Sequence, residues 1–311
     1  MPAKHYLGID VGGTNTVYAI VNDLGQILQE HKLKTLPTRG EKVLLQEMQE
    51  MAQELLLLDS SIQGIGIGLP GIIDIRQGVA IDCPNLGWEN VEVARTFSNE
   101  FGLPVYLEND VRCVALAEKK FGAARLTENA ICLALGTGIG SGIFVRGELL
   151  RGAYGAAGEV GHMNIIPVGG ETCGCGNSGC WETLASATAV VRQAARELEH
   201  ARRVGLETSL KEPLDGRQIA EAARSGDQVA VSVMQEAGRF LGLGLVNLVN
   251  LFNPERIVIG GGLALAGDVL LRPAQTELLR RAMPYPATKV EVVRAELGDA
   301  AGVIGAAVLG M

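Results

Sequence analysis

The sequence predicts an α/β fold built from two similar halves, and two stretches of the chain support that prediction. YLGIDVGGTNTVYAIV (residues 6–21) and ICLALGTGIGSGIFVR (residues 131–146) each contain an apolar strand, a turn of glycine and small hydroxyl residues, and a second apolar strand. Helix-patterned segments follow both hairpins, as expected of a duplicated α/β unit. These segments are residues 41–58 and 111–122 after the first hairpin, and 183–203 and 229–252 after the second.

Both glycine-rich turns have the composition of a phosphate-binding turn. Glycine lets a ligand approach the main chain closely, and exposed turn amides can hold phosphate oxygens. One such hairpin alone is more often an ordinary tight turn. The matched pair instead favours a nucleotide held between the two halves of a duplicated unit.

A third glycine segment occurs in RIVIGGGLALAGDVLLRPAQ, where Gly260, Gly261 and Gly262 lie between a predicted strand and a predicted helix. Backbone at a helix N-terminus beside glycines suits an adenosine or a phosphate. Close packing of the strand against the helix would explain the same glycines equally well.

The two commoner phosphate motifs do not account for this chain. The G-x-x-x-x-G-K-[ST] loop is absent. A G-x-G-x-x-G string does occur at Gly66, Gly68 and Gly71, but Pro70 and the following IIDI argue against a helix there. Because a dinucleotide site of that type needs the helix, we do not expect this string to bind a nucleotide.

Composition and charge exclude several classes of function. Apolar residues make up 47% of the 311 residues, and 27 basic against 35 acidic residues give a formal net charge of −8. This balance argues against a nucleic-acid partner or an anionic membrane surface. The start MPAKHYLGID lacks the apolar stretch of a signal peptide, and no uninterrupted apolar run is long enough to span a membrane. We expect a cytoplasmic protein that binds neither nucleic acid nor membrane.

An acidic residue at a helix start is the candidate catalytic base. LPVYLENDVRCVALAEKKFG (residues 103–122) predicts a strand ending near Glu108 and a helix starting near Asp110. Asn and Asp are also ordinary helix caps. However, strand ends in α/β sheets face the ligand crevice, and a carboxylate there can accept a proton from a substrate hydroxyl. Phosphoryl transfer requires such a base, bound phosphates and a metal, so Asp110 is the candidate, with Asn109 as its hydrogen-bonding neighbour.

Three cysteines close together predict a metal site. Cys173, Cys175 and Cys180 offer thiolates at C-x-C-x₄-C spacing, and His162 in GEVGHMNI is the nearest upstream histidine. A structural zinc site usually has four nitrogen or sulfur ligands, so these four residues would fill it. The alternative is a reduced, metal-free loop.

Two carboxylates flank this predicted site. Glu182 follows Trp181 at the start of a predicted helix, where the helix dipole favours a negative charge, and Glu159 lies three residues before His162. A metal joining His162 to the cysteines would fix the two carboxylates relative to each other. Carboxylates and imidazole bind sugar hydroxyls well, whereas Trp181 is expected to pack in the core.

Six motifs together resemble one family. DVGGTNT, ENDV, LGTGIGSG, GEVGHM, CGCGNSGCWETLAS and IVIGGGLA occur in the order found in ROK-family sugar kinases. The resemblance extends from Asp10 to the C-terminal helix. The GEVGH and C-x-C-G-x-x-G-C pair is highly specific, and ETLASATAV is most similar to bacterial ATP-dependent glucokinases.

The resemblance implies an α/β, actin-like ATPase (ribonuclease H-like) fold of two lobes with a central active-site cleft. Residues 1–119, completed by the C-terminal helix at 298–311, would form the small lobe. Residues 120–297 would form the large lobe, with the zinc-binding loop at 162–180. The family also implies a homodimer or homotetramer.

The resemblance also implies roles for individual residues. Asp110 matches the catalytic base, and four residues match the structural zinc ligands: His162, Cys173, Cys175 and Cys180. Matches to sugar-binding positions are Gly71, Asn85, Asn109, Asp110, Glu159, His162 and Glu182. Matches to ATP-binding positions are Asp10, Gly12, Gly13, Thr14, Thr137, Gly138, Gly261 and Gly262.

The implied reaction is ATP-dependent, Mg²⁺-assisted phosphorylation of a hexose 6-hydroxyl, with glucose as the expected substrate. Kinases of N-acetylglucosamine, N-acetylmannosamine, mannose or fructose share this chemistry and stay open as alternatives. A sugar-responsive transcriptional regulator is a further alternative, since some family members regulate genes. We expect it less, because the first phosphate motif begins at Asp10 and the net charge is −8.

Overall fold

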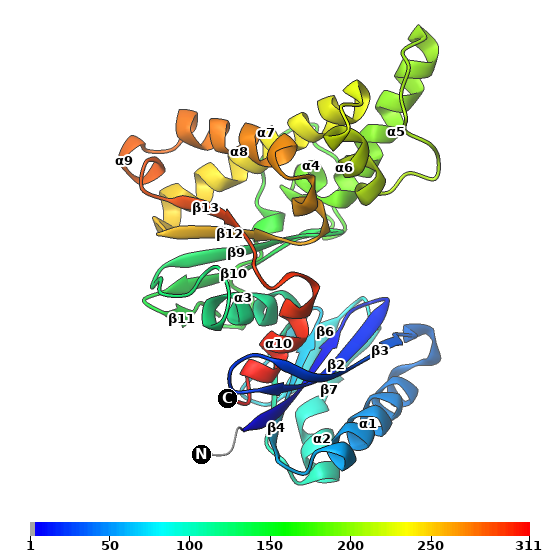
Figure 1. The fold of residues 1–311 in the computed structure, drawn as a ribbon, viewed down its shortest axis with the longest axis vertical. Coiled ribbons are helices and arrows are strands. Elements are labelled where there is room, and N and C mark those ends of the chain that lie inside the picture. The colour runs from blue at the N-terminus through cyan, green and yellow to red at the C-terminus, as the bar shows by residue number, and fades with distance from the viewer. Residues whose placement is uncertain (1–3) are drawn as a thin grey trace. The chain divides into compact units, whose positions relative to one another are not determined.

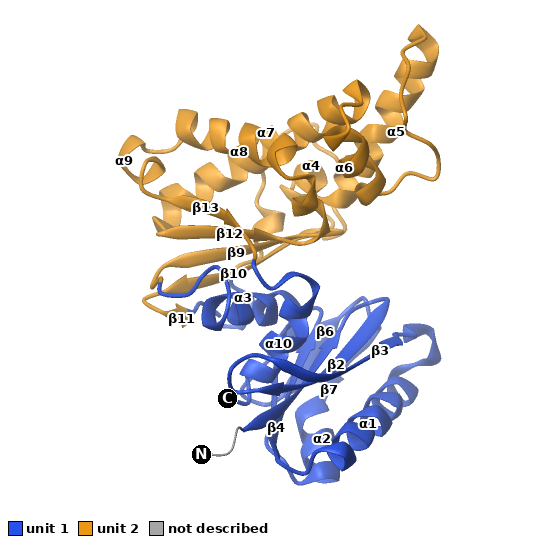
Figure 2. Ribbon diagram, in the orientation of Figure 1, with its two compact units in different colours: residues 1–126, 149–157, 296–311 blue, residues 127–148, 158–295 orange. Residues whose placement is uncertain are grey.

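The computed structural model describes residues 4–311, which divide into two compact units, each with its own sheet (Figure 2). Unit 1 comprises residues 1–126, 149–157 and 296–311, and unit 2 comprises residues 127–148 and 158–295. The chain therefore passes from one unit to the other several times, and the stretch at 149–157 belongs to unit 1 although unit 2 segments flank it.

Unit 1 is built on a five-stranded sheet of order β3-β2-β1-β4-β8 (Figure 1). The first hairpin pairs antiparallel, β3 extends it antiparallel, and β4 and β8 add parallel to β1. The strands are β1 (His5–Val11), β2 (Asn15–Asn22), β3 (Ile27–Lys34), β4 (Ile62–Leu69) and β8 (Val105–Asn109). A second, antiparallel sheet contains β5 (Ile72–Asp74), β6 (Val79–Cys83) and β7 (Trp88–Val91).

Helices cover both faces of the main sheet of unit 1. Successive side chains of β1 point to opposite faces, so Leu7 and Ile9 join a core with the first two helices, while Tyr6 packs with the last. The apolar residues of the first helix recur every three to four positions, which buries one stripe of it. The helices are α1 (Glu41–Leu58), α2 (Val93–Phe101), α3 (Asp110–Lys120) and α10 (Ala301–Val308), with 3₁₀ turns η1 (Pro37–Arg39) and η4 (Gly298–Ala300).

Helix α10 packs unusually closely against the rest of unit 1. It contacts β1, β4 and α3. A Cβ added at Gly66 of β4 would lie 1.8 Å from the Ala306 carbonyl oxygen, and one at Gly305 would lie 1.7 Å from the Cys113 carbonyl oxygen. The backbones themselves are therefore in contact, and no larger residue fits at either position.

Unit 2 repeats the sheet order of unit 1 with β11-β10-β9-β12-β13. Its hairpin again pairs antiparallel, and two further strands again add parallel to the hairpin's first strand. The strands are β9 (Ala130–Leu135), β10 (Ile139–Val145), β11 (Glu148–Leu149), β12 (Arg256–Gly260) and β13 (Glu291–Arg294). The duplication predicted from the two glycine hairpins is present in the fold.

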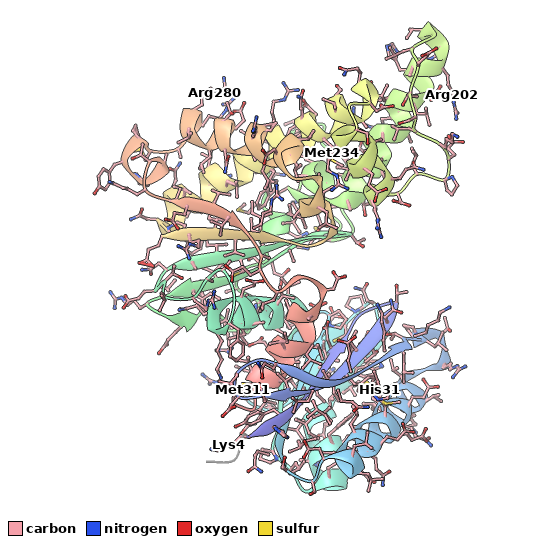
Figure 3. The ribbon with its side chains drawn as sticks, in the orientation of Figure 1. Lys4, His31, Arg202, Met234, Arg280 and Met311 are labelled. Carbon is pink, nitrogen blue, oxygen red and sulfur yellow. The ribbon has the colours of Figure 1, made fainter. Side chains whose placement is uncertain are left out.

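The helices of unit 2 pack around one long central helix, α7, which contacts α5, α6 and α8. Met234 of α7 is fully buried, whereas the Arg202 and Arg280 side chains extend into solvent (Figure 3). The helices are α4 (Glu182–Ala185), α5 (Ala187–Val204), α6 (Gly216–Arg224), α7 (Gln228–Phe252), α8 (Asp268–Arg281) and α9 (Pro284–Ala287), with 3₁₀ turns η2 (Val160–His162) and η3 (Gly262–Ala266).

Helix α7 is the one helix among residues 4–311 that is long and apolar enough to cross a membrane by length and composition. Within its most apolar window, 61% of the residues are buried inside the structure. Contacts with the neighbouring helices of unit 2 account for its apolar character.

Two helix boundaries differ from those predicted. The segment at 183–203 is two helices, because Ser186 leaves the helical conformation and caps α5 by accepting a hydrogen bond from the Ala189 amide. After the glycines of residues 260–262, the 3₁₀ turn η3 comes first, and α8 begins only at Asp268. The expected helix N-terminus beside these glycines is therefore a tight turn.

Candidate functional site

The candidate base lies where β8 ends and α3 begins, a corner formed by residues 108–112. Asn109 caps α3, since its Oδ1 accepts a hydrogen bond from the Arg112 amide at 3.2 Å. Asp110 is the first helical residue, and its Oδ1 accepts from the Val111 amide at 2.8 Å. The cap of α3 and the candidate base are thus two adjacent residues, Asn109 and Asp110.

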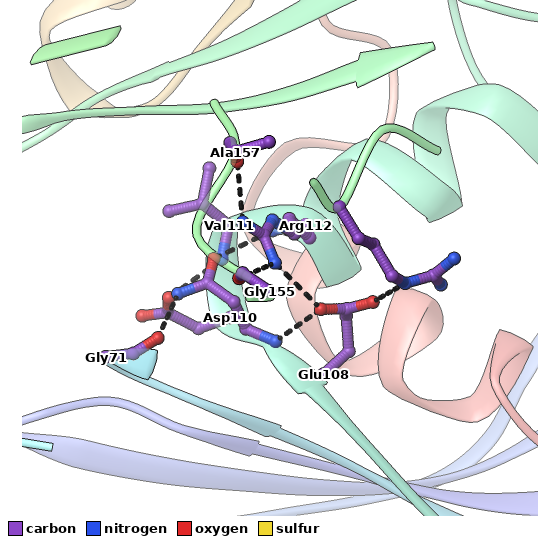
Figure 4. A network of polar contacts seen from close by, with 9 residues as sticks. Gly71, Glu108, Asp110, Val111, Arg112, Gly155 and Ala157 are labelled. Atoms are coloured by element: carbon purple, nitrogen blue, oxygen red, sulfur yellow. Dashed lines mark hydrogen bonds and ion pairs between the residues drawn. The ribbon is translucent and has the colours of Figure 1, made fainter. Parts of the chain in front are cut away.

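A buried charge network lies directly behind this corner (Figure 4). Glu108 is fully buried, and its two oxygens face Arg112 Nη1 at 3.4 Å and Arg151 Nε at 2.7 Å. Arg112 also donates to the carbonyl oxygens of Gly155 at 2.7 Å and Ala157 at 2.6 Å. Because every charge has a partner, the network satisfies the condition under which buried ions are tolerated.

Asp10, at the end of β1, lies beside Asp110. A Cβ added at Gly68 of β4 would lie 3.6 Å from Asp10 Oδ1 and 3.5 Å from the Asp110 Cα. Removal from water raises the pKa of Asp10 to about 7, and the negative charge of Asp110 adds to that rise. The repulsion between the two negative charges favours a bound cation or a proton on Asp10.

The first glycine turn and Asn85 lie next to each other in unit 1. The turn is closed by the Gly12 amide, which donates to the Asn15 carbonyl at 2.9 Å, while Gly13 and Thr14 are exposed. A Cβ at Gly13 would lie 3.8 Å from the Cβ of Asn85, so this exposed asparagine is a neighbour of the turn. The turn therefore presents open backbone beside a polar side chain.

Gly71 joins the corner to the β4–β5 turn. Its carbonyl oxygen accepts a hydrogen bond from Asn109 Nδ2 at 3.2 Å. Its φ of +109° suits glycine, and a Cβ there would lie 2.2 Å from the Asp82 carbonyl oxygen. Gly71 thus positions Asn109 through its backbone. No helix follows the G-x-G-x-x-G string, since β5 begins at Ile72, as the sequence predicts.

In unit 2 the second glycine turn is held by the start of α5. The Gly136 carbonyl accepts from the Ala187 amide at 2.8 Å, and the Thr137 carbonyl accepts from Thr188 Oγ1 at 2.8 Å. Thr137 itself is exposed. The turn therefore keeps a fixed shape while its outer face stays open.

The third glycine segment lies against the same turn. Gly261 has φ +85°, and a Cβ there would lie 2.5 Å from the Leu135 carbonyl oxygen, just before the turn. A Cβ at Gly262 would meet nothing within 4 Å. Gly261 is thus explained by close packing, but against β9 rather than against the following helix, and the backbone at Gly262 borders open space.

The four predicted metal ligands come together in unit 2. One donor atom from each of His162, Cys173, Cys175 and Cys180 lies within 4.8 Å of the other three. The Cys175 and Cys180 sulfur atoms are 3.7 Å apart, and Cys173 Sγ is 3.5 Å from His162 Nδ1. Tetrahedral zinc with Zn–S bonds of about 2.3 Å requires sulfur atoms about 3.8 Å apart. The donor set and its spacing fit zinc.

The thiol pKa values of this cluster are perturbed in different directions. Burial raises the pKa of Cys173 to about 12 and raises that of Cys180, whereas a hydrogen bond from the Asn177 amide lowers that of Cys175. The raised pKa values of Cys173 and Cys180 favour their protonated thiols in the metal-free protein. Metal binding must displace their protons, because the thiolate is the ligand.

Glu182 connects the cysteine cluster to the second glycine turn. Its Oε1 accepts from Cys173 Sγ at 3.0 Å and lies 3.8 Å from His162 Nδ1. A Cβ at Gly138 would lie 2.5 Å from Glu182 Oε2. Glu159 is exposed immediately before η2, and its carbonyl accepts from the His162 amide. The Glu182 carboxylate and the His162 ring thus lie close together, and Glu159 is linked to His162 through the backbone.

Trp181 packs in the core, as expected. It is fully buried, and its indole N–H donates to the Phe240 carbonyl at 2.8 Å. A Cβ at Gly244 would lie 1.9 Å from the indole ring, so α7 accommodates the ring only because residue 244 is glycine. Trp181 thereby fixes the end of the cysteine loop to α7.

Sequence reasoning missed the network of Glu108, Arg112 and Arg151. One signal was available, since Glu108 and Arg112 are four residues apart, the spacing of an ion pair on a helix. Nothing in the local sequence indicates that the Gly155 and Ala157 carbonyls complete the network. That contact depends on a stretch more than forty residues away in the chain.

Comparison with known proteins places the chain in a family. The model of the ROK family matches residues 6–311. A glucokinase from Halalkalibacterium halodurans is 36% identical over 98% of this chain and 94% of its own length.

Solved structures agree with this match. The crystal structure of a ROK family glucokinase from Streptomyces griseus, in complex with glucose and AMPPNP, has a TM-score of 0.83 at 33% identity and covers 97% of this chain and 98% of its own. A ROK family transcriptional regulator, a homologue of the E. coli MLC protein, has a TM-score of 0.89 at 30% identity and covers 98% of this chain and 77% of its own. The fold is thus the actin-like ATPase fold predicted from the motifs, and the chain belongs to the ROK family.

Proposed function

We propose that the protein transfers the γ-phosphoryl group of ATP to the 6-hydroxyl of glucose. The observation that carries the proposal is the placement of Asp110 at the first position of α3, capped by Asn109 and beside Asp10. The similarity to glucokinases over almost their whole length supports the choice of reaction and sugar. N-acetylhexosamines, mannose and fructose stay alternatives, because their kinases share the same 6-hydroxyl chemistry.

In this mechanism unit 1 supplies the base. Asp110 accepts the proton of the sugar 6-hydroxyl as its oxygen attacks phosphorus, and Asn109 holds a neighbouring hydroxyl. The backbone amides of the turn at Gly12–Thr14 bind phosphate oxygens. Asp10 would hold Mg²⁺, since its carboxylate is subject to the negative charge of Asp110, and the bound ion would neutralise charge on the phosphates.

Unit 2 supplies sugar and nucleotide contacts. We assign Glu159, His162 and Glu182 to the sugar hydroxyls, because Glu182 lies 3.8 Å from His162 Nδ1 and Glu159 is exposed three residues before that histidine. The exposed Thr137, with Gly138, is assigned to phosphate, and the open Gly262, with Gly261, to adenosine. Structural zinc held by His162 and the three cysteines would fix this sugar-binding side.

Gly71 and Asn85 complete the sugar-binding assignments in unit 1. We propose that units 1 and 2 are the small and large lobes of the kinase. The predicted boundaries near residues 119 and 298, the cytoplasmic location and the homodimeric or homotetrameric state stay predictions.

The decisive experiment replaces Asp110. Asp110→Asn should lower kcat by about 10²- to 10⁴-fold, the usual loss for a general base, while the protein stays folded. Asp215→Asn is the control, since it makes the same Asp-to-Asn change at the start of another helix, where Asp215 caps α6 of unit 2. Glucose, mannose, fructose and both N-acetylhexosamines are compared by coupled ADP detection. Near-normal turnover by a folded Asp110→Asn variant would remove the base assignment.

A further inference from the structure

The corner that carries Asp110 is held by a salt bridge between Glu108, the first residue of the ENDV motif, and Arg112, which lies outside the motif. The side chains of Glu108 and Arg112 are 0% and 3% exposed, so this pair lies entirely out of water. Arg151, the third member, is 35% exposed. Buried ion pairs rarely add net stability compared with apolar residues, which raises the question of what this one does.

The network reaches Asp110 through the backbone. Glu108 Oε1 accepts from the Asn109 amide at 3.0 Å, so the buried carboxylate restrains the Glu108–Asn109 peptide, one residue before Asp110 (Figure 4). The Arg112 amide in turn binds the Asn109 side chain. Glu108 therefore restrains the backbone of Asn109, and Arg112 restrains its side chain, so both act on the residue that immediately precedes Asp110.

Arg112 also binds a second segment. Its guanidinium uses Nη1 for the Glu108 carboxylate and the Gly155 carbonyl, and Nη2 for the Ala157 carbonyl. A planar fork with several donors can satisfy three acceptors in different directions, which a lysine ammonium on its single flexible stem reproduces poorly. The corner and residues 151–157 are thus joined through one side chain.

We propose that Arg112, acting through Glu108, is a positioning residue for the phosphoryl-transfer reaction: it holds the Asp110 carboxylate in its reactive orientation and fixes residues 151–157 to the same corner. The inference rests on the proposed function, because it assigns Arg112 to the base of that reaction. Arg112 itself touches neither sugar nor nucleotide in this scheme.

The first test is the division of the effect between kcat and KM. Arg112→Met should lower kcat by about 10- to 100-fold, since a displacement of about 1 Å in a catalytic group costs rates of that order. The KM for glucose and for ATP should change less than about threefold. Arg112→Lys, which keeps the charge but loses the fork, should recover part of the lost kcat.

A double-mutant cycle separates positioning from a general structural effect. In the Asp110→Asn background, Arg112→Met should lower the remaining kcat less than about threefold, because the group it positions is already gone. Multiplied losses in the double variant would overturn the inference. So would an Arg112→Met kcat within about twofold of the wild type.

Arg125→Met is the matched control. Arg125 lies five residues beyond the end of α3 and pairs with a distant residue of unit 1, Glu296, at 3.0 Å, but this pair is exposed. Its kcat should match the wild type. Should Arg112→Met fail to fold because it leaves Glu108 short of a partner, Arg112→Lys and Glu108→Gln enter the same cycle.

A readout independent of activity keeps this inference distinguishable from the proposed function. Amide hydrogen exchange of residues 108–112 and 151–157 should become faster in Arg112→Met and stay unchanged in Arg125→Met. If the wild-type protein phosphorylated no hexose, the proposed function would be wrong. The exchange result alone would then show whether Arg112 joins residues 108–112 to residues 151–157. Unchanged exchange in both segments would overturn the inference.

Discussion

Two regions of the molecule each hold a carboxylate to which we assign a function, and they do so by different means. At the β8–α3 corner, Asp110 is held by regular secondary structure and by a network in which protein groups satisfy every buried charge. In the cysteine loop, residues 163–181 form no helix or strand beyond two isolated bridges, and Glu182 follows directly. The first carboxylate depends on hydrogen bonds, whereas we expect the second to depend on a metal.

Removing a metal ligand should have the largest effect, and this effect should be confined to the cysteine loop and the residues that it positions. Cys175→Ser should lower zinc affinity by more than about 100-fold, since even residues outside the ligand set change metal affinity 10- to 100-fold. Sugar binding should weaken more than nucleotide binding, because the cysteine loop carries His162 and leads to Glu182. Metal analysis and calorimetric titrations with glucose and with an ATP analogue measure these effects.

Asn177→Ala is the control for this loop, because Asn177 is exposed and is not among the four ligands. It should retain zinc and sugar affinity. Purified wild-type protein that contains no zinc and is fully active would refute the metal's role.

Trp181 is the second support of the cysteine loop, and its removal should cost stability without acting on the corner. Trp181→Ala should reduce the free energy of unfolding by about 3–5 kcal/mol, the usual range for deleting a buried aromatic ring. Urea denaturation measures this change. The Asp110-dependent step should be spared, so a variant that stays folded but loses kcat as severely as Asp110→Asn would contradict the separation of the two regions.

The corner should be sensitive to pH through Asp10. The pKa of this carboxyl is raised from 3.8 to about 7 in the folded protein. A raised folded pKa adds stability that is fully present below the unfolded value and is lost as the pH rises through the folded value. Ligand-free wild-type protein should therefore lose ~1.4 kcal/mol of this contribution per pH unit between about pH 4 and pH 7.

Asp10→Asn isolates this contribution, since the amide cannot ionise. The difference in free energy of unfolding between the variant and the wild type should grow from pH 4 to pH 7 and then level off. Denaturant titrations across this range measure the difference. A constant difference would show that Asp10 does not titrate in this window.

The smallest effect is expected at the cap of α3. Asn109→Ala removes the acceptor for the Arg112 amide and should cost about 1 kcal/mol of stability. Thermal denaturation in the absence of sugar gives this value. A loss of several kcal/mol would mean that the Asn109 contact with Gly71 supports far more of unit 1 than one turn of helix.

Local sequence patterns predicted much of the fold. The two apolar hairpins predicted β1, β2, β9 and β10, because a strand pattern and a glycine turn are each determined by residues close together in the sequence. The first helix was predicted at residues 41–58, where α1 lies, since its apolar spacing is regular. The four metal ligands also meet, because three of them are close in sequence and histidines are few.

Long-range contacts were beyond such patterns. The β5–β7 sheet depends on pairing between short strands with little alternation. Arg112 looks like one more charged helix residue, and its burial follows only from carbonyl oxygens at Gly155 and Ala157. The turn after the three glycines was also missed, because Gly261 is determined by its contact with Leu135 in another strand.

The close fit of α10 against β1 and β4 has a consequence for how the protein is made on the ribosome. Residues 301–308 are synthesised long after β8 and α3, yet Gly305 touches the Cys113 backbone, and a Cβ at Gly302 would lie 2.1 Å from the Asp10 carboxylate. The nascent chain must therefore carry an incomplete unit 1, with one face of its sheet uncovered, until α10 emerges. All the residues of unit 2 precede α10, so that unit can reach its final form first.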